Sequence, residues 1–145
     1  MMYLDTSYIV KCYLHESGTD AILAWLEGQG GLSCCLHGRM EFFAAVQRHV
    51  REGRLPRSDA RRTLRRLEAD ERGNLWHWIP IFPELIRETC SRMEGLPEDV
   101  FLRSADALHL TCAAANGFSA VYSHDRHLLN AAPHFGLEGR DILRG

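Results

Sequence analysis

Short apolar runs alternate with longer segments whose apolar residues have helical spacing, and this alternation constrains the fold more than any other feature of the sequence. We expect strands at residues 1–4, 32–36, 74–81, 120–123 and 137–143. We expect helices at residues 7–14, 19–27, 39–51, 56–72, 83–93, 103–116 and 125–132. Strands separated by helices predict right-handed βαβ units and a parallel sheet covered on both faces. The prediction is a three-layer α/β/α domain with a parallel sheet of about five strands.

The length and composition predict a single domain over residues 1–145, because no linker, repeat or low-complexity tract interrupts the pattern. The net charge of −2 excludes nucleic-acid binding by bulk charge but leaves room for a local basic patch. No apolar run approaches the ~18 residues of a membrane span, and the first residues lack the basic region of a signal peptide. Five cysteines without a C-x-x-C pair indicate reduced thiols, so we expect a cytoplasmic protein.

Four acidic residues occupy positions where a parallel sheet brings side chains together. Asp5 follows the first expected strand, and Asp125 follows the fourth. Glu41 lies in the first turn of the helix after the second strand, and Asp106 in the first turn of the helix before the fourth. Ligands bind at the carboxyl ends of the strands in such sheets. If the first strand is central, these four side chains converge on one crevice.

Each acid also has a structural interpretation. Asp5 and Asp125 precede helices, where Asp is a preferred N-cap, and Glu41 near a helix start interacts favourably with the helix dipole. Asp106 lies among apolar residues, so it needs a partner such as Arg103 or a cation. Clustered carboxylates raise one another's pKa, and a divalent cation relieves that repulsion. Oxygen ligands favour Mg²⁺ or Mn²⁺, which can activate water for attack on a phosphodiester.

Four segments resemble, in order, the conserved segments of the PIN-domain nucleases, and the chain length is similar to that of the VapC-type toxins of bacterial toxin–antitoxin pairs. The segments are LDTS at 4–7, MEF at 40–42, RSADALHL at 103–110 and VYSHDRHL at 121–128. The resemblance implies a parallel five-stranded sheet and a Mg²⁺- or Mn²⁺-dependent endoribonuclease activity. It also implies an RNA substrate, a cognate antitoxin and a homodimer.

The resemblance further implies which residues form the site. Metal binding and catalysis fall to Asp5, Glu41, Asp106 and Asp125, and the supporting polar residues are Thr6, Ser104 and Ser123. Two departures from the family pattern stand out. Many members carry another acid just after the last Asp, where this chain has Arg126, His127 and Asn130, and residues 34–38 are atypical of the family.

Basic and imidazole side chains add further candidates. Residues 48–72 hold nine arginines and five acids, which indicates either a solvated helix with ion pairs or a surface that contacts the RNA backbone. His109, His124 and His127 are interpreted as packing or RNA-contact residues, because a metal-activated water needs no histidine. The candidate RNA contacts are Arg61, Arg62, Arg65, Arg66, Arg103 and Arg126.

Two alternatives to a nuclease remain open. Phosphotransfer through an aspartyl phosphate needs an Asp-x-Asp motif or a late catalytic lysine, whereas residues 4–7 read LDTS and Lys11 is the only lysine. A non-catalytic interaction module could use the same fold. The favoured prediction is a metal-dependent endoribonuclease that acts as the toxin of a toxin–antitoxin pair.

Overall fold

A five-stranded parallel sheet forms the centre of the structure, a computed structural model that describes residues 1–144. Its strand order is β3-β2-β1-β4-β5, so the first strand is central, which is the condition for the four acids to converge. Every neighbouring pair runs parallel. The strands are β1 (Met2–Leu4), β2 (Leu32–Cys35), β3 (Trp76–Ile79), β4 (Ala120–Tyr122) and β5 (Glu138–Arg140).

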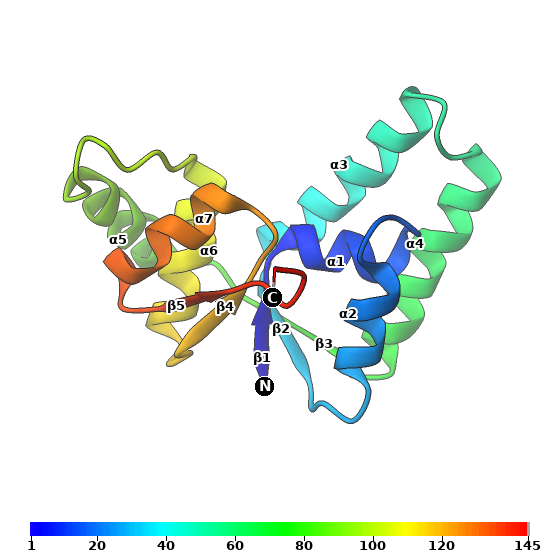
Figure 1. The fold of residues 1–145 in the computed structure, drawn as a ribbon, viewed down its shortest axis with the longest axis horizontal. Helices are drawn as coiled ribbons and strands as arrows, with labels where there is room; N and C mark the ends of the chain where they lie inside the picture. Colours follow the sequence, from blue (N-terminus) through cyan, green and yellow to red (C-terminus); the bar gives the residue numbers. More distant parts are fainter. Residues whose placement is uncertain (145) are drawn as a thin grey trace.

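Within residues 1–144, seven helices surround this sheet and confirm the predicted three-layer α/β/α fold. In Figure 1, α1 to α4 gather on one side of the view and α5 to α7 on the other, and α3 and α4 form a long hairpin. The helices are α1 (Thr6–Tyr13), α2 (Thr19–Leu26), α3 (His37–Arg51), α4 (Arg57–Arg72), α5 (Pro83–Glu94), α6 (Ser104–Ala115) and α7 (Arg126–Ala131), followed by a 3₁₀ turn, η1 (Ala132–Phe135).

The central strand explains why the carboxyl edge of the sheet becomes a site. Tyr3 and Leu4 are fully buried, and the chain leaves β1 at Asp5, whose backbone N–H still donates to the Tyr122 carbonyl at 3.0 Å. Strands β2 and β4 flank β1 and end at the same edge. Asp5 is therefore held between two neighbouring strands, and its carboxylate cannot move away from the residues that follow them.

Gly38, in the first turn of α3, marks a close approach of three elements. A Cβ atom there would collide with the Cys34 sulfur, and it would lie 3.3 Å from Cε1 of His109 and 3.5 Å from Oγ1 of Thr6. Because glycine has no side chain, α3 can pack directly against β2 and α6 at this point.

The structure differs from the predicted elements mainly at their ends. The strand expected at residues 74–81 is limited to Trp76–Ile79, and the one expected at 137–143 to Glu138–Arg140. All five cysteines are free thiols, in agreement with the sequence analysis. Among residues 1–144, no helix is both long enough and apolar enough to cross a membrane.

Candidate active site

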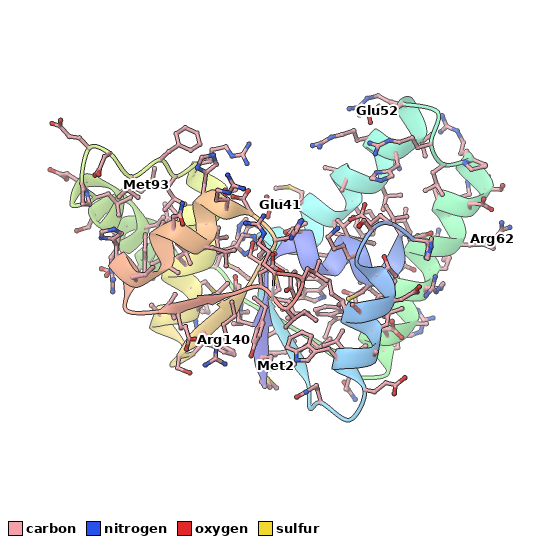
Figure 2. All side chains as sticks on the ribbon, viewed as in Figure 1. Met2, Glu41, Glu52, Arg62, Met93 and Arg140 are labelled. Carbon is pink, nitrogen blue, oxygen red and sulfur yellow. The ribbon has the colours of Figure 1, made fainter. Side chains whose placement is uncertain are left out.

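The four predicted acids line one pocket of about 350 Å³ at the carboxyl edge of the sheet. Figure 2 shows Glu41 where the two groups of helices meet. The other lining residues are Thr6, Ser7, Val10, Ala44, Ala45, Arg48, Arg103 and His109. The topology thus brings together residues that are up to 120 positions apart in the sequence, between Asp5 and Asp125.

Asp5 is the most constrained of the acids, with only 3% of its surface exposed. One carboxylate oxygen accepts a hydrogen bond from the Ser7 hydroxyl at 2.6 Å and one from the Tyr8 N–H at 3.3 Å, so the residue also caps α1. The other oxygen accepts from the Ser123 hydroxyl at 2.6 Å. Burial raises the pKa of Asp5 to about 6, although His109 and these hydrogen bonds act in the opposite direction.

Asp106 and Asp125 form a second part of the cluster and share one cation. The guanidinium of Arg103 lies 3.7 Å from the Asp106 carboxylate and 3.3 Å from that of Asp125. Burial, followed by the negative charge of Asp125, raises the pKa of Asp106 above its ordinary value. Asp125 also caps α7 by accepting from the N–H of His127 at 2.8 Å. The structural and functional interpretations of the capping acids are therefore compatible.

Glu41 is held by a hydroxyl and by imidazole rings. Its Oε1 atom accepts from the Thr6 hydroxyl at 2.8 Å and from Nε2 of His109 at 2.7 Å, and Nε2 of His37 lies 3.6 Å away. Burial acts to raise the pKa of Glu41, but the hydrogen bond and charge of His109, with further help from Thr6 and His37, hold it below its ordinary value. Glu41 is thus kept ionised in the pocket.

The orientation of His109 follows from its own partners. Its Nδ1 lies 2.7 Å from the Tyr3 hydroxyl, whose oxygen accepts from the Cys35 N–H at 3.0 Å. The hydroxyl proton of Tyr3 can therefore donate to Nδ1, which leaves Nε2–H to donate to Glu41. The sequence analysis missed this role. The i,i+3 spacing from Asp106 to His109, which places both on one face of α6, is the signal that could have found it.

Of the predicted supporting residues, Ser123 contacts the acids directly, whereas Ser104 lies outside the pocket. Ser123 links two acids, because its hydroxyl donates to Asp5 and accepts from the Asp125 N–H at 2.9 Å. Ser104 and Arg126 are exposed at the first residues of α6 and α7, and among the described residues neither lines the pocket.

The arginines of α4 lie apart from the four acids of the pocket. Figure 2 shows Arg62 on the outer side of α4, far from Glu41. The pocket is instead lined by Arg103 and by Arg48 from α3, which the sequence analysis had not selected as an RNA contact. Of the residues that the structure describes, none of the four α4 candidates lines this pocket: Arg61, Arg62, Arg65 and Arg66.

The donor set fits a hard divalent cation. Three aspartates and a glutamate offer carboxylate oxygens, while the main cation between them, Arg103, is 65% exposed at its side chain. Burial first, and the charge of Asp125 second, raise the pKa of Asp106, and a bound cation would favour its ionised form. Clustered carboxylates at the carboxyl edge of an α/β/α sheet are an arrangement that suits a metal-dependent nuclease.

Comparisons with known proteins agree with this class. The model of the PIN domain matches residues 2–133, so the chain belongs to the PIN domain family, as the sequence motifs predicted. It is 29% identical over 146 residues to Ribonuclease VapC47 of Mycobacterium tuberculosis (strain CDC 1551 / Oshkosh), covering 94% of this chain and 93% of that protein.

A solved structure shares the fold. The crystal structure of Mycobacterium tuberculosis VapC20, described as a sarcin-ricin loop cleaving toxin, matches with a TM-score of 0.70 and 14% sequence identity. The match covers 90% of this chain and 95% of that one. The three-layer PIN fold is thereby supported by an experimental structure as well as by the family match.

Proposed function

We propose that the protein is a metal-dependent endoribonuclease and the toxin of a toxin–antitoxin pair. The observation that carries the proposal is the convergence of Asp5, Glu41, Asp106 and Asp125 in one pocket of a PIN domain. A relative that spans nearly the whole chain is named a ribonuclease, which supports RNA as the substrate. The names of both VapC proteins support a cognate antitoxin as partner. We further propose that the protein is cytoplasmic and forms a homodimer.

The chain's own residues organise the reaction. Asp5, Asp106 and Asp125 would hold Mg²⁺ or Mn²⁺, and Glu41 completes or orients the cluster. When bound, such an ion polarises a phosphate oxygen and supplies an activated water.

The remaining pocket residues hold these acids and receive the substrate. Ser7 and Ser123 fix both oxygens of Asp5, while Thr6 and His109 fix Glu41. Arg48 and Arg103 line the same pocket, where their guanidinium groups can bind RNA phosphates. The hydrogen bonds that hold Asp5, Glu41 and Asp125, together with the ion pair between Arg103 and Asp106, favour catalysis over a non-catalytic interaction module.

The first test is the chemistry of the cleaved ends. Attack by water on the phosphodiester is expected to give products with a 5′-phosphate and a 3′-hydroxyl, because the ribose 2′-hydroxyl takes no part. A pool of cellular RNAs would be incubated with the protein in Mn²⁺ or in EDTA, and the new ends analysed. Products that carry a 2′,3′-cyclic phosphate and form equally well in EDTA would contradict the proposal. They would instead indicate a metal-independent reaction in which histidines act as acid and base.

A second test separates the two sets of arginines. We expect Arg48→Gln and Arg103→Gln each to weaken RNA binding and to reduce the slope of log affinity against log salt by somewhat under one unit, about 0.7 for each lost phosphate contact on a single strand. The reason is that both side chains line the pocket. The measurement is RNA affinity across a range of salt concentrations.

The control for this test is the exposed face of α4. There Arg62 and Arg65 are ion-paired with acids of the same helix, and Arg66 lies over the Tyr13 ring. Replacing these three residues and Arg61 with Gln is expected to leave the salt slope unchanged, as for a solvated helix. If the α4 variant shows a smaller slope of log affinity against log salt and the two pocket variants do not, RNA binds along α4.

A further inference from the structure

Two imidazole rings and a carboxylate form a compact cluster beside the acidic pocket. One nitrogen from each of His37 and His109 and one carboxylate oxygen of Glu41 all lie within 4.8 Å of one another. Nε2 of His109 is 2.7 Å from Oε1 of Glu41, Nε2 of His37 is 3.6 Å from it, and the two ring centroids are 4.1 Å apart. We propose that this cluster binds a borderline divalent transition-metal ion, Zn²⁺, at a site that shares only Glu41 with the carboxylate site.

The donor types distinguish this cluster from the neighbouring acids. Two histidine nitrogens with one glutamate oxygen are a ligand set that suits Zn²⁺ and leaves a fourth position open. Mg²⁺ instead prefers oxygen ligands throughout, as in the set formed by Asp5, Asp106 and Asp125. The two sites therefore select different metals, although Glu41 and His109 of the histidine cluster also line the acidic pocket.

A second observation comes from the partners of the two rings. The His37 ring is 9% exposed, and its Nε2 lies 2.9 Å from the carbonyl oxygen of Ala105, to which it donates. Its Nδ1 is buried without a hydrogen-bond partner among the described residues. Buried polar nitrogens are nearly always paired. Because Nε2 carries the proton donated to Ala105, Nδ1 holds the free lone pair of this ring and is the His37 nitrogen that can bind an ion.

The outer contacts of the rings also match those of metal ligands. Ligating histidines usually donate their second ring N–H to a carbonyl or another oxygen, which fixes the orientation of the ring. In this protein the Ala105 carbonyl accepts that N–H from His37. For His109, the Tyr3 hydroxyl oxygen lies 2.7 Å from Nδ1 and would accept a hydrogen bond from Nδ1–H once an ion takes the place of the proton on Nε2. Each ring is thus oriented by one partner from the fold before any ion binds.

An entry path for the ion exists through the acidic pocket. Glu41 and His109 both line it, and the Glu41 side chain is 30% exposed. The neighbouring carboxylates of Asp5, Asp106 and Asp125 favour the entry of cations. An ion on Oε1 of Glu41 would replace the hydrogen bond from His109 and withdraw Glu41 from the carboxylate site. Zn²⁺ is therefore expected to inhibit RNA cleavage, a consequence that rests on the proposed function.

The test measures Zn²⁺ binding by calorimetry and Co²⁺ binding by its visible absorption, with Co²⁺ as the spectroscopic substitute. His37→Asn and His109→Asn are each expected to weaken Zn²⁺ affinity by more than about 100-fold, since loss of even an outer partner weakens it about 10- to 100-fold. Asp5→Asn should weaken Zn²⁺ affinity far less than either histidine change, because it removes a nearby charge and leaves all three ligands in place. The matched control is His134→Asn, whose side chain is exposed on η1.

Melting curves of the apo variants check that they fold, and His37→Asn provides the test if the buried His109 proves essential for stability. Unchanged Zn²⁺ affinity in folded His37→Asn would overturn the proposal. So would a loss of Zn²⁺ affinity in Asp5→Asn as large as that expected for His37→Asn, because the ion would then lie among the aspartates. Neither readout depends on RNA cleavage, so absence of nuclease activity would contradict the proposed function and leave the zinc site standing.

Discussion

Asp5→Asn and Asp106→Asn are each expected to lower the rate of RNA cleavage by about a thousandfold or more, with the fold intact. A bound metal contributes several kcal/mol of transition-state stabilisation, and each 1.36 kcal/mol corresponds to a factor of ten in rate. Loss of about 4 kcal/mol therefore gives about a thousandfold. Both carboxylates line the pocket, and both substitutions keep the size of the side chain. The measurement is the cleavage rate at saturating Mn²⁺.

The double variant tests whether the two aspartates act as one catalytic unit. Residues that act as one unit are not additive, so Asp5→Asn combined with Asp106→Asn should cost little more activity than either change alone. Asp99→Asn is the matched control, because Asp99 is exposed in the turn before α6 and lies outside the pocket. If either single variant keeps more than about a tenth of the activity, the acid in question is not part of the catalytic unit.

Mn²⁺ is expected to raise the melting temperature by about 8 °C at a hundredfold excess over its dissociation constant. Binding to the folded state alone gives about 2.7 kcal/mol at that excess, and a domain of this size gains about 3 °C per kcal/mol. Asp106→Asn should reduce this shift. It should also raise the melting temperature of the metal-free protein, because burial and Asp125 disfavour the ionised form of Asp106.

Calorimetric or fluorescence melting curves across a range of Mn²⁺ concentrations provide the measurement. His37→Asn separates the two metal sites, since it should retain the Mn²⁺ shift even though it loses the zinc cluster. Asp99→Asn should behave as the unmodified protein does in both respects. A melting temperature that stays constant as Mn²⁺ increases would count against a carboxylate metal site.

The sequence predicted the fold and the acid positions because both follow from local rules. An apolar run that stops at Asp5 identifies a buried strand and the residue at its carboxyl end. Asp106, placed among alanines and leucines, indicates a buried carboxylate that needs partners. The rules for βαβ connections then place these side chains at one edge of the sheet.

The contacts between helices could not be read from the sequence. Glu41 and His109 are separated by 68 positions, and their hydrogen bond depends on how α3 and α6 are rotated about their axes. The arginine run shows the same difficulty, because charge alone does not tell that Arg48 faces the pocket while Arg62 points outward from α4. The exact strand ends were also missed, since flanking apolar residues continue beyond the last ladder hydrogen bonds.

The missing side chain at Gly38 constrains the order in which this site can accumulate mutations. Alanine at position 38 would meet the Cys34 sulfur directly, and the ring of His109 lies next in its path. A change of Gly38 alone therefore forces the Cys34 sulfur to move and makes a tight contact with the ring that positions Glu41, whereas a prior change of Cys34 to alanine removes the first obstacle. We therefore expect the effects of changes at positions 34 and 38 to be non-additive, with Gly38→Ala tolerated better after Cys34→Ala than before it.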